Sequence, residues 1–406
     1  MDGVTRGSDQ TEPRLRTRAF RPVRHLYVHL PFCVHRCGYC DFVTAVGRRD
    51  EHRAYAEALV AELELERRRL GARVETVFVG GGTPTFTEPD ALAFILEQLP
   101  AADEVTVEAN PETVTPELAA LLRGAGVNRV SVGAQSFRPP LLEVLERRAT
   151  PDDVRRAVHT LRDVGFDNIS LDLIYGIPGQ TAADLDADLA DALALEPEHL
   201  SCYELEAKPG TRFTHAHGAA LERQAEALEG YYERVVDSLT DAGYRWYETA
   251  NFCRDDRHRE LRARHNLGIW HAADYLGVGV GAVSTLGNER RRNLPSVGRY
   301  VDALAGGSAP PREVERLDAS TREVERLMLG LRLDRPLPLA GVKEALDDRG
   351  VERMQRLGLV ELRNGTIALT RRGRLLGTAV TVELLAEPVG AVRGPPAATA
   401  ALELAV

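Results

Sequence analysis

Lysine is almost absent from this sequence. Only Lys208 and Lys343 occur, and all other basic residues except histidine are arginines. Schiff-base chemistry needs a lysine amine, so the chain offers few candidates for a pyridoxal-phosphate enzyme. A Gly-x-x-x-x-Gly-Lys-Ser/Thr phosphate loop is also missing, which argues against a P-loop nucleotide hydrolase.

Long apolar runs are missing too. No stretch approaches the ~18 apolar residues of a membrane span, and residues 1–20 lack the apolar segment of a secretory signal. We therefore expect a cytoplasmic protein with reduced thiols. The formal net charge of -10 gives no general attraction to nucleic acid, so we expect no nucleic-acid partner.

Cysteine is rare, yet three of the five cysteines lie in one short stretch. Cys33, Cys37 and Cys40 are spaced C-x3-C-x2-C and follow an apolar run, 26–30, that predicts a buried strand. A [4Fe-4S] cluster normally takes four thiolates. A set of three would leave one iron open to a small molecule, as at a catalytic metal site. The odd count and tight spacing argue against a disulfide.

A structural zinc ion is the main alternative for this stretch. His29 or His35 could complete a tetrahedral site with the three thiolates. Zinc ribbons usually carry two C-x2-C knuckles, however, whereas this chain has one compact group. The spacing favours an iron-sulfur cluster, and a zinc-stapled binding module remains the non-redox alternative.

Strand-like and helical segments alternate through the first half of the chain. Strict alternation predicts an α/β fold with a parallel sheet and right-handed crossovers, with chemistry at the carboxyl ends of the strands. Helices are expected over 50–70, 88–99 and 221–242, and Thr115-Pro116 marks the start of another. The expected parallel strands are 26–30, 76–79, 104–110, 129–136, 168–176 and 199–206, and a further strand is expected at 244–248.

The cysteine stretch resembles the cluster loop of radical S-adenosylmethionine (SAM) enzymes. The Tyr27-x-His29-x-Pro31-Phe32-Cys33 pattern narrows the resemblance to the oxygen-independent coproporphyrinogen III oxidase-like group. It implies a partial (βα)6 TIM-type barrel. It also implies a [4Fe-4S] cluster on Cys33, Cys37 and Cys40, with SAM bound at the open iron.

Residues at the strand ends match SAM contacts of this group. The triple glycine 80–82 makes a loop without side chains, which allows backbone groups to approach a ligand; a tight turn is the alternative. Glu108 could accept hydrogen bonds from a ribose diol, although a capping or salt-bridge role is commoner for an isolated glutamate. The residues that the resemblance assigns to SAM are Tyr27, Gly81, Gly82, Thr83, Glu108, Gln135, Arg147 and Asp172.

Two of these residues need particular surroundings. Asp172 lies within a buried strand, where a carboxylate needs a polar partner such as a sugar hydroxyl or an arginine. Arg147 occupies the arginine of the group's Gly-Arg-x-His motif, but Glu146 and Ala149 replace the glycine and the histidine. A solvent-facing helix is the alternative for Arg147.

The segment 265–270 resembles the His-Asn-x-x-Tyr-Trp haem-binding motif of the HemW branch, the haem chaperones. His265 is then the candidate haem ligand, because imidazole is a common axial ligand, while Ile269 replaces the motif tyrosine. A surface histidine in an arginine-rich loop is the alternative. Coproporphyrinogen oxidases carry a further cysteine two residues after the third ligand, where this chain has Phe42.

The resemblance therefore implies a haem chaperone that binds haem, a [4Fe-4S] cluster and SAM and passes haem to an acceptor protein. SAM cleavage is expected to remain within its capacity, but coproporphyrinogen oxidation is not. The alternative is a radical SAM enzyme acting on a porphyrin. A monomer or homodimer is expected, with transient contact to a membrane or respiratory protein.

Five parts are expected along the chain. After a disordered segment 1–20, the barrel covers 21–245 and the haem-motif region packing on it covers 246–307. Helices at 321–331 and 338–349 and a hairpin at Asn364-Gly365, followed by a helix capped by Thr370, predict a winged-helix-like domain over 308–386. Its expected role is packing rather than DNA binding. Residues 387–406, rich in alanine and proline, are expected to be a disordered tail.

Overall fold

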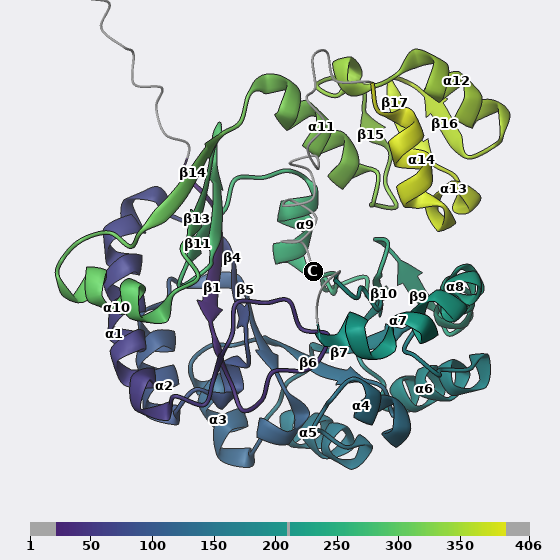
Figure 1. Cartoon of the computed structure of the whole chain (residues 1–406). Helices are drawn as coiled ribbons and strands as arrows, with labels where there is room; N and C mark the ends of the chain where they lie inside the picture. Colours follow the sequence, from purple (N-terminus) through teal and green to yellow (C-terminus); the bar gives the residue numbers. More distant parts are fainter. Residues whose placement is uncertain (1–21, 209–211, 387–406) are drawn as a thin grey trace, which may run out of the picture.

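The computed structural model describes residues 22–208 and 212–386. The two terminal segments that we expected to be disordered lie outside the described residues. The main body is a nine-stranded sheet in the order β11-β1-β4-β5-β6-β7-β8-β10-β9, curved into a partial barrel (Figure 1).

All six expected barrel strands are present and run parallel to their neighbours. The predicted α/β fold is therefore confirmed, and the carboxyl ends of these strands meet at one mouth of the barrel. The six strands are β1 (His25–Leu30), β4 (Val74–Gly81), β5 (Ala102–Ala109), β6 (Arg129–Gln135), β7 (Ile169–Tyr175) and β8 (His199–Glu204).

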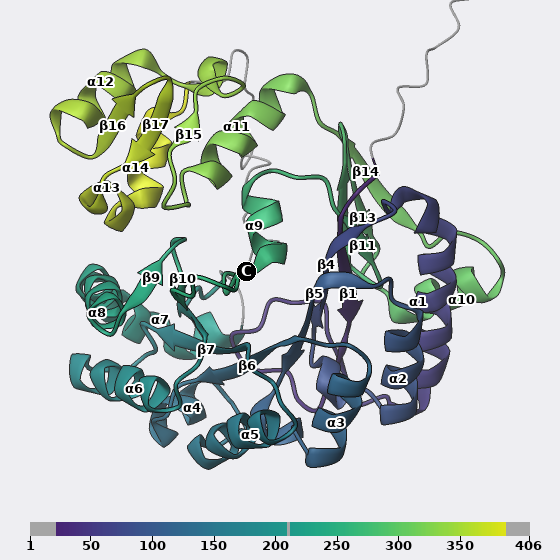
Figure 2. The same cartoon turned by 180° about the vertical axis from the view of Figure 1, so that it is seen from behind.

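Helices cover the outer face of the sheet (Figures 1 and 2). Thr115 caps one of them as expected, since its side chain accepts a hydrogen bond from the Leu118 backbone nitrogen at 3.2 Å. The single helix expected over 221–242 is wrong, because the chain forms two helices separated by a 3-10 turn, Ala225–Ala227. The helices are α1 (His52–Glu66), α2 (Pro89–Gln98), α3 (Pro116–Gly124), α4 (Pro139–Val144), α5 (Pro151–Asp163), α6 (Ala182–Ala194), α7 (Arg212–Gln224) and α8 (Leu228–Asp241).

The sheet extends beyond residue 245. Strand β11 (Leu276–Val278) adds to it in parallel beside β1, and β10 (Asn251–Arg254) pairs antiparallel with β8 and with β9 (Tyr244–Trp246). The 246–307 region, expected to pack on the barrel, thus contributes strands to the barrel sheet. Strand β11 is too short to be recognised as a sheet strand from the sequence.

A second, three-stranded antiparallel sheet follows. It contains β12 (Val283–Leu286), β13 (Glu289–Asn293) and β14 (Arg312–Arg316), with α10 (Val297–Ala305) between the last two strands. The 306–311 segment, which has a linker composition, therefore connects a helix to a strand of the same sheet.

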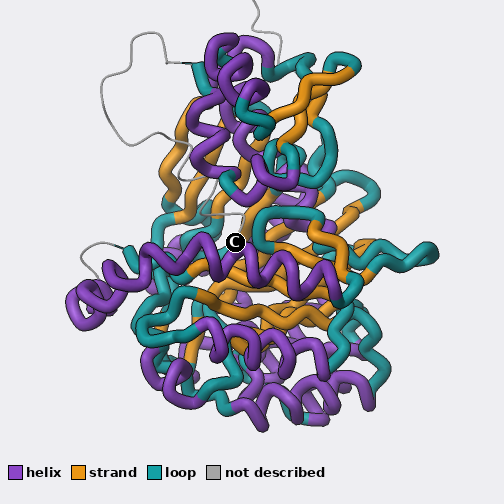
Figure 3. Tube along the Cα trace, turned by 90° about the vertical axis from the view of Figure 1, so that its right-hand side faces the viewer, coloured by secondary structure: helices purple, strands orange, loops and turns teal. Residues whose placement is uncertain are grey.

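The C-terminal part has its own hydrophobic core and lies above the barrel in Figure 3. The hairpin around Asn364-Gly365 is confirmed, and Thr370 caps α13 by accepting from the Gly373 nitrogen at 3.0 Å. The helix expected over 338–349 is wrong, because Pro338 pairs with β17 and helix α12 begins only at Asp348. The elements are α11 (Ala319–Gly330), β15 (Leu337–Pro338), α12 (Asp348–Arg356), β16 (Val360–Arg363), β17 (Thr366–Leu369), α13 (Arg371–Leu375) and α14 (Gly377–Leu384).

A buried carboxylate ties α1 to the segment after β11. The fully buried Glu62 accepts hydrogen bonds from the backbone nitrogen of Gly279 at 2.8 Å, from Asn293 at 2.9 Å and from Tyr300 at 2.6 Å. Arg312 of β14 neutralises it at 2.7 Å. This network holds the 279–282 loop against the barrel.

Replacing Glu62 by alanine should destabilise the protein by about 3–5 kcal/mol, because the Gly279 nitrogen, Asn293 and Tyr300 lose their buried acceptor and Arg312 keeps only its ion pair with Glu66. Denaturant unfolding measures the effect. Glu64→Ala on the exposed side of the same helix is the matched control, and its ion pair with Arg67 should contribute at most about 1 kcal/mol. Equal losses in the two variants would contradict the assignment.

Candidate cluster and nucleotide site

The three clustered cysteines lie on a closed loop at the mouth of the barrel. Cys33 ends β2 (Phe32–Cys33), which pairs in parallel with β3 (Ala45–Val46). The Gly47 nitrogen donates to the Cys33 carbonyl at 2.9 Å and closes the loop at its base. Cys33 is buried, whereas Cys37 and Cys40 are half-buried.

Two side chains from other barrel segments reach these sulfurs. The Thr83 hydroxyl donates to Cys33 Sγ at 3.5 Å, and Arg147 Nη1 donates to Cys37 Sγ at 3.7 Å. Burial raises the pKa of the Cys33 thiol to about 11. A thiolate at this position therefore needs a cation, and coordinated iron would supply the positive charge.

The histidines that could complete a zinc site are already engaged. His29 bonds Tyr27 Oη at 3.0 Å through Nδ1 and the Val43 carbonyl at 2.8 Å through Nε2, and His35 Nε2 lies 3.6 Å from a Glu146 oxygen. Among residues 22–208 and 212–386, no three His, Cys, Asp or Glu side chains surround a common point for one metal ion. An iron-sulfur cluster binds each thiolate at a separate iron, so it does not need the fourth side chain that a closed zinc site takes.

The glycines at the end of β4 allow the cysteine loop to approach. A Cβ atom on Gly82 would lie 2.6 Å from the Pro31 carbonyl oxygen and 3.0 Å from Cys33 Sγ. Gly81 has φ +113°, which L side chains rarely adopt, and a Cβ there would meet the His29 ring at 2.6 Å. The glycines therefore allow the end of β4 to lie close to the cysteine loop itself.

Arg147 points into the site and not to solvent. Its Nη2 donates to the Gly133 carbonyl at 2.7 Å and to Asn110 Oδ1 at 3.1 Å, and Asn110 Nδ2 donates to Thr83 Oγ1 at 3.3 Å. The chain of contacts connects the ends of β4, β5 and β6 to two cysteines. The neighbouring Arg148 is exposed, and both arginines lie between α4 and α5, so the expected alternative of a solvent-facing helix is wrong. Asn110 was missed in the sequence because a single asparagine after a strand carries no distinctive signal.

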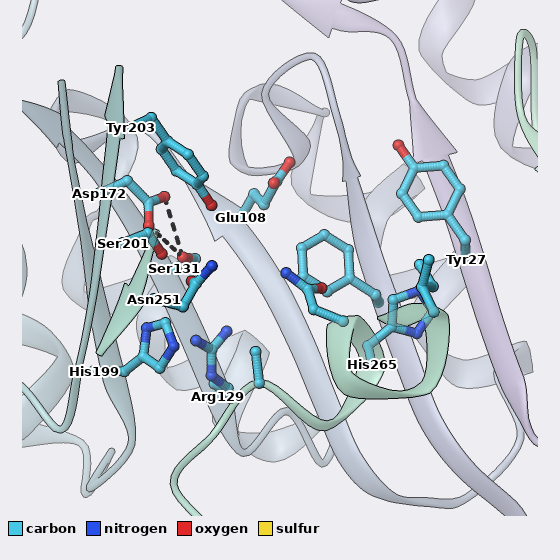
Figure 4. Close-up of a pocket in the computed structure, with 14 residues that line it drawn as sticks. Tyr27, Glu108, Arg129, Ser131, Asp172, His199, Ser201, Tyr203, Asn251 and His265 are labelled. Carbon is cyan, nitrogen blue, oxygen red and sulfur yellow. Dashed lines mark hydrogen bonds between the residues drawn. The ribbon is translucent and has the colours of Figure 1, made fainter. Parts of the chain in front are cut away.

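Glu108 and Asp172 face one another across the barrel interior (Figure 4). Glu108 accepts a hydrogen bond from the Gly81 nitrogen at 3.0 Å, and Asp172 accepts from the Ser131 hydroxyl at 3.1 Å. Burial, followed by repulsion from Asp172, raises the pKa of Glu108 to about 8. Burial also raises the pKa of Asp172. The polar partners that Asp172 needs are thus serines within the protein, Ser131, Ser170 and Ser201.

Gln135 is held in a strained conformation at the end of β6. Its φ is +64°, in the left-handed region that non-glycine residues rarely adopt, and the pairing of β6 with β7 shifts register between Gly133 and Gln135. Such outliers cluster at ligand sites, which agrees with the SAM contact expected there.

A cavity of about 50 Å³ occupies the barrel interior below this mouth. Tyr27, Glu108 and Asp172 are the expected site residues that line it, and His265 joins them from α9 (Arg264–Trp270). The other polar residues of the lining were not predicted from the sequence. These are Arg129, Ser131, His199, Ser201, Tyr203, Asn251 and Asn266.

His265 lies at the end of the barrel opposite the cysteines. Its Nδ1 bonds Thr76 Oγ1 at 2.9 Å near the start of β4, and Glu104 near the start of β5 accepts from the Arg264 and His265 backbone nitrogens at 3.0 and 3.1 Å. Burial lowers the pKa of His265 to about 3. The cavity beside it is far smaller than the roughly 300–1,000 Å³ of small-molecule pockets, so haem reaches His265 only if α9 moves. His265 is buried and is not a surface residue.

Cys202 and Cys253 take no part in this site. They are buried in β8 and β10.

Within residues 22–208 and 212–386, every helix is too short or too polar to span a lipid bilayer.

The sequence and structure match known proteins. The family model of the radical SAM superfamily matches residues 27–192, and that of the HemN C-terminal domain matches residues 317–376. The chain is 38% identical to heme chaperone HemW of Mycobacterium tuberculosis over 89% of this chain and 94% of that protein. It is 32% identical to heme chaperone HemW of Bacillus subtilis over 90% of this chain and 100% of that protein.

Among solved structures, coproporphyrinogen III oxidase (HemN) of Escherichia coli, described as a radical SAM enzyme, superposes with a TM-score of 0.75 at 24% identity. The match covers 90% of this chain and 91% of that chain. At this identity the match establishes the fold, including the C-terminal part.

Arg147→Gln should lower the affinity for the cluster by about 10- to 100-fold, because outer-shell partners of metal ligands typically contribute that much. Iron and sulfide per chain, measured after anaerobic reconstitution and timed exposure to a chelator, report the loss. Arg148→Gln is the matched control and should behave as the unmodified protein. An unchanged rate of iron loss in Arg147→Gln would show that the contact with Cys37 is incidental.

SAM affinity should rise as the pH increases through about 8, the value to which burial and Asp172 raise the pKa of Glu108. Below that pH the folded protein holds Glu108 neutral, and a neutral carboxyl accepts weaker hydrogen bonds from ribose hydroxyls than a carboxylate does. The same shift lowers folding stability as the pH rises from about 4.5 to about 8, since only the unfolded chain releases the proton there. Calorimetric titration of SAM between pH 6.5 and 9 tests the effect, and Glu108→Gln should abolish this part of the pH dependence.

Proposed function

We propose, because the chain belongs to the radical SAM superfamily and within it to the HemW haem-chaperone family, that this protein binds haem and transfers it to an acceptor protein. It carries a [4Fe-4S] cluster on Cys33, Cys37 and Cys40 and binds SAM beside it. In this proposal the protein acts in the cytoplasm.

One observation carries the choice of chaperone over oxidase. The cysteine loop at the barrel mouth contains three thiols and continues into Phe42, a phenylalanine that is 46% exposed, where coproporphyrinogen oxidases would have a further cysteine. The greater identity to proteins named heme chaperone than to the oxidase supports the same choice. A porphyrin-modifying enzyme remains the alternative.

The residues around the mouth have distinct tasks in this proposal. Thr83 and Arg147 hold the cysteine loop over the strand ends, Gln135 offers a side-chain amide, and Glu108 and Asp172 accept hydrogen bonds from the nucleoside. When bound, a reduced cluster of this kind supplies the electron that cleaves the SAM sulfonium. The protein residues exclude water and fix the orientation of the nucleotide.

Haem is the cargo, and His265 is its proposed iron ligand. We call the end of the barrel opposite the cysteines its floor. In the structure described here, which we call closed, His265 is buried and Glu104 and Thr76 hold α9 to this floor. Haem binding therefore requires α9 to leave the floor and expose His265. Weakening the contacts of α9 with the floor should speed haem uptake without removing the ligand.

An apolar hollow at the barrel mouth is the other place that could take haem. Its volume of about 320 Å³ lies within the range of small-molecule pockets. It is lined mainly by Leu205, Ala207, Leu221 and Leu228. No histidine lines it, which is why His265 remains the preferred ligand.

Glu104→Gln should accelerate haem uptake several-fold, because a neutral amide holds the start of α9 less strongly than a carboxylate does. His265→Ala should lose the Soret shift of bound haem. Stopped-flow absorbance of haem mixed with the full-length protein measures both effects. Leu221→Arg is the control at the mouth hollow and should leave the uptake unchanged.

Three results would contradict the proposal. Uptake that survives His265→Ala but fails in Leu221→Arg would place haem at the mouth hollow. Anaerobic turnover that yields 5'-deoxyadenosine together with a modified porphyrin would identify an enzyme. Zinc in place of iron in anaerobically purified protein would exclude the radical SAM chemistry altogether.

A further inference from the structure

Arg129 is an arginine in the interior of the barrel that has no hydrogen-bonded or ion-paired partner among the described residues. It is 2% exposed, lines the cavity, and makes no hydrogen bond or salt bridge through its side chain to any residue the structure describes. The guanidinium group stays protonated in proteins, so Arg129 keeps its positive charge. Glu104, Glu108 and Asp172 act on this charge only through longer-range electrostatics. A buried guanidinium group without hydrogen-bond acceptors is costly, so its N–H groups need an acceptor from outside the chain.

A second side chain in the same lining also lacks a partner. Asn251 is 1% exposed, and its Nδ2 donates to Glu248 at 2.8 Å while its Oδ1 has no donor. Figure 4 shows Arg129, His199 and Asn251 beside one another below Asp172. A single ligand that accepts hydrogen bonds from Arg129 and donates one to Asn251 would satisfy both side chains.

His199 does not supply this partner. Its Nδ1 bonds Ser170 Oγ at 2.8 Å and its Nε2 bonds Tyr247 Oη at 2.7 Å, so both ring nitrogens are engaged. Burial, followed by repulsion from Arg129, lowers its pKa well below the usual value. His199 therefore lines the cavity as an uncharged imidazole.

The nearby carboxylates are already occupied by other donors. Glu104 accepts from the start of α9, Glu108 from the Gly81 nitrogen and Asp172 from Ser131. None of them lies within salt-bridge distance of Arg129. Their negative charge repels an anion that enters the cavity, so the affinity of the cavity for an anion is expected to be weak.

The space fits a small ligand. A water needs about 10–15 Å³ of such volume, so the cavity of about 50 Å³ holds on the order of three or four water-sized groups. That number corresponds to the oxygens of a small planar oxyanion. Haem and SAM are both much too large for it.

We propose that the floor of the barrel is a binding site for a small oxyanion that keeps one hydroxyl, of the hydrogencarbonate class. Two of its oxygens accept hydrogen bonds from the Arg129 guanidinium, and its hydroxyl donates to Asn251 Oδ1. His265 lines the opposite side of the same cavity, and its Nε2 also has no partner. The site lies beneath the proposed nucleotide site, and its ligand stabilises the closed floor.

Thermal unfolding of the full-length, cluster-loaded protein at pH 8 tests the site with neither haem nor SAM present. Sodium hydrogencarbonate should raise the melting temperature by about 2–4 °C, with half-saturation on the order of 1 mM. Formate, which lacks the hydroxyl, should give a smaller shift. Sodium chloride at equal ionic strength should give none.

Arg129→Gln should lose the response to hydrogencarbonate. Arg68→Gln, at an exposed arginine, should retain it. An equal response in Arg129→Gln, or a response of the unmodified protein that chloride reproduces, would overturn the proposal.

A crystal structure of the unmodified protein soaked in hydrogencarbonate covers the case in which Arg129→Gln does not fold. Planar density against the guanidinium group is the expected result, and separate water molecules alone would overturn the proposal. Because the assay contains no haem, its outcome is independent of the haem-chaperone proposal.

Discussion

The close contact between the cysteine loop and the end of β4 is the constraint on which the site depends. Gly82 lies against the Pro31 carbonyl and Cys33 Sγ, and its backbone nitrogen donates to the Leu30 carbonyl at 2.8 Å. A side chain at this position would push the loop away from the strand ends. The reach of Thr83 and Arg147 to the sulfurs follows from this contact, because both act over single hydrogen-bond distances.

The barrel and the cluster loop could be predicted from the sequence because their signals are local. Six apolar segments alternate with helical ones, and three cysteines fall within eight residues, 33–40. The SAM residues were found through a family resemblance, and the structure brings Glu108 and Asp172 to one cavity. Their roles as ligand contacts remain predictions.

Other features depend on contacts between distant residues and could not be read from the sequence. Periodicity alone does not reveal the 3-10 turn that separates α7 from α8. Strand β11 has three residues and becomes recognisable only by its pairing with β1. The burial of His265 results from Thr76 and Glu104, which precede it in the chain by 189 and 161 residues. A motif match identifies such a histidine but not the end of the barrel at which it lies.

The position of β11 connects the two ends of the barrel through the covalent chain. The segment 271–275 links α9 directly to β11, and β11 pairs with Leu26, Tyr27 and Val28 of the strand that leads into the cysteine loop. A shift of the floor helix would thus pull on the strand beneath the cluster. Thermodynamic linkage makes any such coupling reciprocal: whatever factor haem imposes on SAM affinity, SAM imposes on haem affinity. The protein would then release its cargo according to the state of its nucleotide, with no second subunit needed to carry the signal.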